Sequence, residues 1–224
     1  MRSTLLLAAT ALLQLVSSHN LISNAVGDAG GKGIAFGVSS PTSNSQSDTT
    51  TFRGSNNKFG STQKGAINPA AQLAAAQQIA GSNTLPQVEG QITLTLHQIN
   101  ADGAGPMSCS IDTAAAGTFE GTTVATDVPG KNGRSNAADQ DFPLVVDVPA
   151  GTVCTGTLGT VKNVCLVKCQ NPAGPFGGVV AFQMASGAAG AAGAAVAAGG
   201  AKGGNAANAN GSGKKQGRWV AVEW

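Results

Sequence analysis

Short segments typical of β-strands, separated by turn residues, occupy the chain from residue 87 to residue 184. In the clearest of them, residues 91–99, Ile and Leu alternate with Thr and His, so one face is apolar and the other polar. Further strands are predicted at residues 108–112, 119–126, 142–148, 164–169 and 179–184. Turns rich in Gly and Pro are predicted at residues 100–106, 129–130, 149–151 and 172–178. This spacing predicts an all-β fold, an immunoglobulin-like antiparallel β-sandwich with long loops.

The segment before these strands has a different composition. Residues 19–38 are Gly-rich with short apolar pieces, which predicts a strand, a loop and a second strand. Residues 39–64 are dominated by Ser, Thr, Asn and Gln and predict a long surface loop. One short helix is predicted at residues 68–80. Asn68 can cap it, Pro69 suits the first helical position, and Gly81 can end it.

Residues 1–18 are predicted to be a signal peptide. They carry a single charge, Arg2, and an apolar run shorter than the roughly 20 residues needed to cross a bilayer. Val16 and Ser18 then supply the pattern that signal peptidase recognises, and cleavage after Ser18 makes His19 the first residue of the mature protein. We therefore expect a secreted, extracellular protein that is not bound to a membrane.

Four cysteines, Cys109, Cys154, Cys165 and Cys169, are expected to form disulfides in the oxidising extracellular environment. Cys165 and Cys169 lie on one predicted strand, four steps or about 13 Å apart. A disulfide requires Cα atoms within about 7 Å, so these two cysteines are not expected to pair with each other. We predict the pairs Cys154–Cys165, across a hairpin, and Cys109–Cys169.

The end of the chain is of low complexity. Residues 186–217 consist largely of Ala and Gly, which offer no side chains for a core, and predict a disordered tail. Both Trp residues lie in an aromatic tip, residues 218–224. The expected organisation is a signal peptide (1–18), a β-sandwich domain (19–185), an Ala/Gly-rich linker (186–217) and the tip. The formal net charge of +2 is too small for a nucleic-acid-binding surface.

The two histidines of the mature chain are the candidate metal ligands. His19 would offer its α-amine and one ring nitrogen, and His97, near the end of a strand, would offer another. Three nitrogens in a plane suit Cu(II), and the arrangement is called a histidine brace. The amine can deprotonate near neutral pH because its ordinary pKa is about 7.7–8.0. Phe176 or Phe182 would occupy the axial position, since the chain has no Tyr.

Other chemistries have weaker support in the sequence. No G-x-S-x-G nucleophile motif is present. Asp102, Asp112 and Asp127 supply carboxylates of the kind that glycosidases use in pairs, but aspartates in Gly-rich turns are more often structural.

A series of motifs resembles the Egh-like virulence factors of fungi, the secreted, appressorium-associated gas and mas proteins. The motifs are Pro86-Gln87, the string LHQINADGAGP at residues 96–106, Cys109, and GPFGG at residues 174–178. The resemblance covers about residues 19–185 and implies a secreted protein expressed during host penetration. Members commonly begin their mature form with His, as His19 does here, and this start is similar to that of copper monooxygenases acting on polysaccharides. The chain departs from the family in having no Cys before Cys109 and none directly after the GPFGG segment.

Three functions are therefore considered. The first is an infection-associated, effector-type virulence factor that acts at the host–fungus interface through a copper histidine brace, or by binding a host protein or cell-wall polysaccharide without turnover. The second is a copper-dependent oxidoreductase on cell-wall polymers, similar to lytic polysaccharide monooxygenases. The third is a structural cell-surface protein held in the wall by its tail. We expect a monomer in each case, with no nucleic-acid partner.

Overall fold

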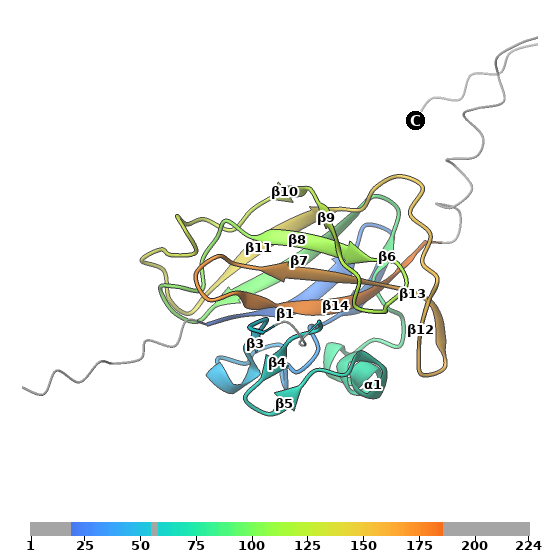
Figure 1. Cartoon of the computed structure of the whole chain (residues 1–224), viewed down its shortest axis with the longest axis horizontal. Helices are drawn as coiled ribbons and strands as arrows, with labels where there is room; N and C mark the ends of the chain where they lie inside the picture. Colours follow the sequence, from blue (N-terminus) through green and yellow to red (C-terminus); the bar gives the residue numbers. More distant parts are fainter. Residues whose placement is uncertain (1–18, 55–57, 186–224) are drawn as a thin grey trace, which may run out of the picture. The chain divides into compact units, whose positions relative to one another are not determined.

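A computed structural model describes residues 19–54 and 58–185. In these residues two β-sheets face each other as a sandwich, with one short helix at its side (Figure 1). The predicted all-β sandwich is confirmed. The predicted signal peptide, Ala/Gly-rich linker and aromatic tip lie outside the described residues. Within the described residues, no helix is both long and apolar enough to cross a membrane.

The first sheet has five strands, all antiparallel, in the order β10-β11-β7-β1-β2. Their bounds are β1 Asn20–Gly27, β2 Gly30–Gly33, β7 Gln91–Gln98, β10 Val124–Thr126 and β11 Gln140–Asp147. The strand pair predicted at residues 19–38 is thus the β1–β2 hairpin.

The second sheet follows the order β5-β4-β3-β14-β13-β8-β9, with β12 beside β13 and β6 beside β14. The bounds are β3 Thr50–Thr51, β4 Ser61–Thr62, β5 Gly65–Ala66, β6 Gln87–Val88, β8 Ser108–Asp112, β9 Glu120–Thr122, β12 Gly156–Leu158, β13 Val161–Gln170 and β14 Phe176–Met184. The pair β6–β14 is parallel, and the other pairs of this sheet are antiparallel.

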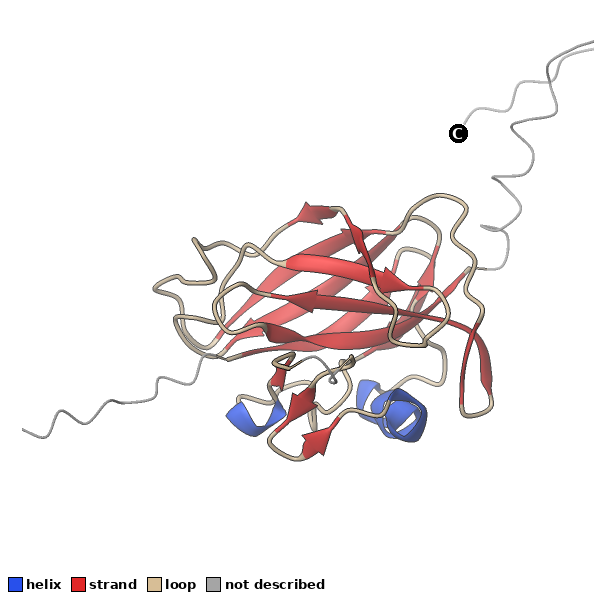
Figure 2. Ribbon diagram, viewed as in Figure 1, coloured by secondary structure: helices blue, strands red, loops and turns tan. Residues whose placement is uncertain are grey.

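The core lies between the sheets, where the alternation seen in the sequence turns apolar side chains inward. Leu94 and Leu96 on β7 are fully buried, as are Val180 and Phe182 on β14. Gly178 permits close approach of the sheets, because a Cβ atom there would lie 3.2 Å from the Ile22 side chain. Figure 2 shows how strands dominate the fold, with short helical segments outside the sheets.

The helix α1, Pro69–Ala80, has the ends that the sequence predicted. The Asn68 side chain accepts a hydrogen bond from the Ala71 N–H at 3.2 Å, and Gly81 ends the helix with φ 65°. Pro69, Leu73 and Ala76 are its buried residues. The helix lies with β3, β4 and β5 at the side of the sandwich (Figure 1).

Three predicted boundaries were wrong. The single strand at residues 119–126 is two strands, because the chain leaves the second sheet after β9 and joins the first sheet as β10. The turn at residues 172–178 ends earlier, since β14 already begins at Phe176. The surface loop at residues 39–64 contains a 3-10 helix, η1 (Gln46–Asp48), and the strands β3 and β4.

Both predicted disulfides are confirmed. Cys109 and Cys169 face each other on β8 and β13, with Cα atoms 4.1 Å apart. Cys154 and Cys165 join the two sides of the β12–β13 hairpin, with Cα atoms 5.0 Å apart. One disulfide therefore fastens two strands of the second sheet, and the other closes a local hairpin.

The disulfide of longer span is expected to contribute more to stability. Cys109–Cys169 closes 60 residues and Cys154–Cys165 closes 11. The chain-entropy model gives stabilisations of about 4 and about 3 kcal/mol, respectively. Urea denaturation of the two double Cys→Ala variants would measure both losses. A larger loss for the Cys154/Cys165 variant would contradict this order.

A buried carboxylate, Asp48, holds the polar loop in place. Its Oδ2 accepts hydrogen bonds from the hydroxyls of Ser39, at 2.5 Å, and Ser43, at 2.6 Å, and Lys64 Nζ lies 2.5 Å from Oδ1. Burial raises the pKa of Asp48, but the bonds from Lys64, Ser39 and Ser43 outweigh burial and lower this pKa to about 2. The segment that the sequence predicts only as a surface loop, residues 39–64, is therefore held by a buried, charged Asp48.

Asp48→Asn is expected to reduce the free energy of unfolding at neutral pH by about 2 kcal/mol, since each unit of pKa depression corresponds to about 1.4 kcal/mol. The folded-state pKa lies below the unfolded value, so this stabilisation is present above about pH 4 and disappears as the pH falls toward about 2. Denaturant melts of both proteins across this range would measure it, with Asp147→Asn as control. A difference that persists at the acid end would contradict the assignment.

Candidate functional site

The pairing of β1 with β7 decides where the two histidines lie. Leu21 stands opposite His97 in the register, and the Ile99 N–H donates a hydrogen bond to the His19 carbonyl at 3.1 Å. His19, two residues before Leu21, therefore lies opposite Ile99 and diagonal to His97. Diagonal residues of an antiparallel pair are about 7–8 Å apart, within reach of long side chains. Tertiary structure thus brings two residues far apart in sequence to the same end of the same sheet.

His19 is 5% exposed and has a defined set of neighbours. Its backbone N–H donates to Asn100 Oδ1 at 3.0 Å. Its ring lies 5.6 Å from the Phe176 ring, centroid to centroid, with 32° between the planes. Phe182, the other aromatic considered for the axial position, is fully buried opposite Cys165 on β13. Of the two, Phe176 is therefore the ring beside His19.

The turn within the motif LHQINADGAGP packs against the backbone of His19 and Asn20. A Cβ atom on Gly103 would lie 2.2 Å from the His19 carbonyl oxygen, so this position has room only for glycine. Asn20 Nδ2 donates to the Gly103 carbonyl at 2.7 Å, and Asn171 Nδ2 donates to the Asp102 carbonyl at 2.7 Å. These contacts of the motif fix the position of the start of β1.

His97 lies between two carboxylates. Its Nδ1 is 2.8 Å from Asp141 Oδ1, on the adjacent strand β11, and its Nε2 is 3.4 Å from Asp139 Oδ1. The His97 side chain is 14% exposed, whereas both aspartates are largely exposed. Asp139 also accepts a hydrogen bond from Asn44 Nδ2 at 2.9 Å and has φ 53°, in the left-handed region that Asp tolerates. The His97 ring is therefore held in one orientation.

A copper ion bound by two imidazoles and an amine would take its ligands from His19 and His97, at this end of the sheet. A carboxylate only accepts hydrogen bonds, so contact with Asp141 places the proton of a neutral His97 on Nδ1 and leaves the Nε2 lone pair for a metal. A neutral α-amine on His19 would have a lone pair for the metal and an N–H for Asn100. Among the described residues, no group of three His, Cys, Asp or Glu side chains is placed as a metal site. A histidine brace is not such a group, because it has only two His side chains and its third ligand is the α-amine.

Two of the aspartates considered for glycoside hydrolysis stabilise turns. Asp112 accepts hydrogen bonds from the backbone N–H groups of Ala114 and Gly117. Asp127 accepts from those of Met107 and Val128. These contacts match the structural role expected from their Gly-rich surroundings.

The partners of the histidines could not be identified from the sequence. Asp139, Asp141 and Asn100 have no motif that marks them as neighbours of His97 or His19. The only available signal was the alternation on residues 91–99, which places His97 on the polar face of its strand. Pairing with β11 and β1 supplies the rest, and this requires the register.

Comparison with known proteins gives one family and two named relatives. The family model described as "Egh16-like virulence factor" matches residues 17–177. The chain is 43% identical over 195 residues to the appressoria-specific virulence factor GAS1 of Pyricularia oryzae, covering 80% of this chain and 78% of that protein. It is 41% identical over 124 residues to the appressoria-specific virulence factor GAS2 of the same fungus, covering 51% of this chain and 43% of that protein. No solved structure matches.

Gly103→Ala is expected to displace the start of β1, because the new methyl group would overlap the His19 carbonyl. Overpacking of this kind costs about 1–3 kcal/mol of folding free energy. Thermal melting would measure the loss, and amide exchange at Ile99 would report whether its bond to His19 is weakened. Gly121→Ala is the control, since a Cβ atom at Gly121 meets nothing within 4 Å. Equal stability of the two variants would contradict the supporting role of the motif.

Proposed function

The chain belongs to the Egh16-like virulence factor family, and on that premise we propose that it acts at the interface between fungus and host. Its homologues are appressoria-specific virulence factors, and the protein has an infection-associated virulence role. Its two disulfides fit an extracellular protein. Secretion through residues 1–18, with His19 as the new amino terminus, is part of the proposal.

At this interface the mature protein would bind one copper ion through the His19 amine, the His19 ring and His97 Nε2. The observation that carries the proposal is the register that makes His19 a diagonal neighbour of His97 at the end of one sheet. A copper ion bound there would supply one-electron redox chemistry for the activation of dioxygen or peroxide. The substrate class would be cell-wall polysaccharide.

The surrounding residues would prepare the ligands rather than react. Asp141 would keep the proton of His97 on Nδ1 and orient the ring, since the two atoms are 2.8 Å apart. Asn100 would orient the amine through the contact that it now makes with the His19 N–H. Phe176, beside the His19 ring, would exclude water from one side of the site. Asp141 and Asn100 would thus position the ligands, and Phe176 would limit the access of water to them.

The principal alternative is a protein that binds a host protein or wall polymer without turnover. The largely exposed carboxylates of Asp139 and Asp141 beside His97 and the absence of a G-x-S-x-G motif are compatible with it. The two functions differ in one observation: a His97→Ala strain of normal infectivity, together with a mature protein that does not bind copper, would favour simple binding. A structural role in the wall requires the tail, so deletion of residues 186–224 would then release the protein into the medium.

The mature chain beginning at His19 is expected to bind one Cu(II) per molecule. A chain with one additional Ala before His19 converts the amine into an amide, and its affinity is expected to fall more than about 100-fold. Asp141→Asn should weaken binding about tenfold, because it disturbs only the orientation of the His97 ring. Calorimetric titration and the electron paramagnetic resonance spectrum of Cu(II) would measure both effects. Unchanged binding by the extended chain would exclude the brace.

A further inference from the structure

A cluster of phenylalanine rings surrounds one lysine of the second sheet. The Lys168 ammonium lies 4.3 Å from the centre of the Phe119 ring and 5.6 Å from that of Phe52. Phe59 meets Phe119 edge to face, with centroids 6.3 Å apart. We call these four residues the Lys168 cluster. All three rings are partly exposed, which is notable in a chain with only seven Phe residues.

The cluster lies on the outer face of the sheet. The neighbours of Lys168 on β13, Val167 and Cys169, are fully buried, and strand alternation turns Lys168 the opposite way. The cluster and the His19 site are neighbours along the chain. Phe52 belongs to the cluster, and the next residue, Arg53, lies over the Phe176 ring at 5.5 Å.

The positive charge of the cluster has no acidic partner among the described ion pairs. These pairs involve Lys64 and His97, and not Lys168. Burial lowers the pKa of Lys168, so the protein bears a cost for keeping an ammonium there. Asp112, two residues along from the cross-strand partner of Lys168, is occupied by backbone N–H groups.

A second cation borders the cluster. The Lys58 side chain covers Gly117, where a Cβ atom would lie 2.6 Å from Lys58 Cδ. Gly117 is two residues from Phe119 in the loop before β9. The domain as a whole is slightly acidic, since residues 19–185 contain 8 Lys or Arg and 10 Asp or Glu residues. The positive charge around the phenylalanines is therefore a local feature rather than a general one.

We propose that the Lys168 cluster binds an acidic polysaccharide, a polymer of uronic acid sugars. The C–H groups of a sugar ring pack against phenyl rings, whose faces carry partial negative charge. The carboxylate of a uronate pairs with the Lys168 ammonium, and that of a neighbouring sugar pairs with Lys58. Neutral glucans offer the stacking without the charge, so they would bind more weakly. The proposal rests on the extracellular role proposed above, but not on the copper site.

A single-stranded nucleic acid also combines anionic and stacking groups, but the low net charge of the chain disfavours it. The polymers that a protein at the host–fungus interface meets are those of cell walls. The experiment therefore includes a nucleic acid as a competing ligand.

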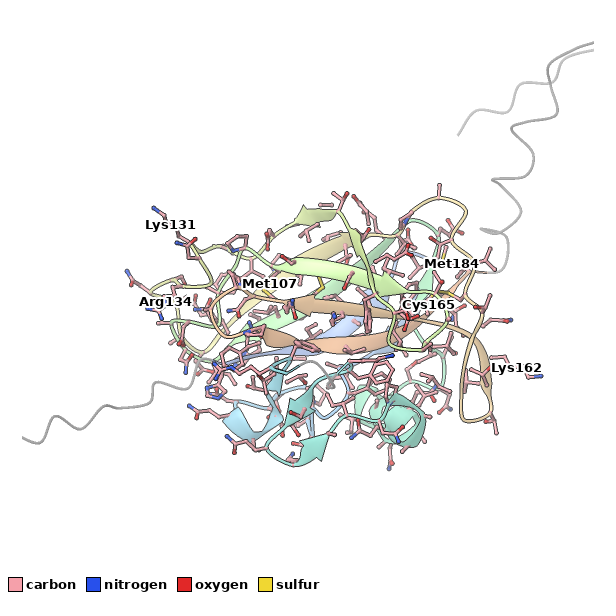
Figure 3. All side chains as sticks on the ribbon, in the orientation of Figure 1. Met107, Lys131, Arg134, Lys162, Cys165 and Met184 are labelled. Carbon is pink, nitrogen blue, oxygen red and sulfur yellow. A yellow bond between two sulfur atoms is a disulfide. The ribbon has the colours of Figure 1, made fainter. Side chains whose placement is uncertain are left out.

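The test is the affinity of the mature full chain for polygalacturonate, measured by calorimetry in a buffer with a chelator, so that copper plays no part. Lys168→Met keeps the aliphatic stem and is expected to weaken binding about tenfold. Lys168→Arg should bind more tightly than Lys168→Met, because an Arg side chain keeps the positive charge that pairs with a carboxylate. Lys162→Met is the matched control: Lys162 lies on the same strand, at the exposed β12–β13 hairpin (Figure 3). It should not change the affinity.

Phe119→Leu provides a second route if Lys168→Met fails to fold. It should also weaken binding, and fully methyl-esterified galacturonan should bind more weakly than polygalacturonate to the wild type. The proposal is overturned if the wild type does not bind polygalacturonate, or if Lys168→Met or Phe119→Leu binds as tightly as the wild type. Tighter binding of polyuridylate than of polygalacturonate would also overturn it. Loss of copper binding in the previous experiment would leave these outcomes unaffected.

Discussion

The antiparallel pairing of β1 with β7 is the interaction on which the rest of this structure depends. It places Leu21 opposite His97 and His19 one row further, at the end of the sheet. A bulge between Ile22 and Asn24 shifts the register along β1. A slip of one residue would turn His97 toward the core and Leu96 toward solvent, so burial of the apolar face of β7 protects the position of His97.

The same end of the sandwich is rigid for a second reason. Loops from three parts of the chain meet there through Asn171, whose side-chain amide donates to the carbonyls of Asp102 and Ala104 and, more weakly, to that of Gly133. The Cys109–Cys169 disulfide joins the strands that lead into two of these loops. A strand terminus supported in this way holds its first residues at a fixed position.

The charges of the domain are distributed by role. Asp48, Asp112 and Asp127 accept hydrogen bonds that stabilise loops. Asp139 and Asp141 contact the His97 ring. Lys168 stands apart, because its neighbours are aromatic rings rather than carboxylates. We propose a metal as the ligand of the His19 site and an anionic polymer as the ligand of the Lys168 cluster.

Local patterns in the sequence determined the strands of the sandwich, the capped helix at Asn68 and Gly81, and both disulfides, because alternation, capping and the rise per strand residue act over a few neighbouring residues. They also marked His19 and His97 as the candidate ligands. Only the tertiary structure decided the sheet order and the change of sheet between β9 and β10. It also decided that Phe176 rather than Phe182 lies beside the His19 ring, and that His97 pairs with Asp141. Each of these depends on the register between strands distant in sequence, and that register follows from burial of the whole core rather than from any local motif.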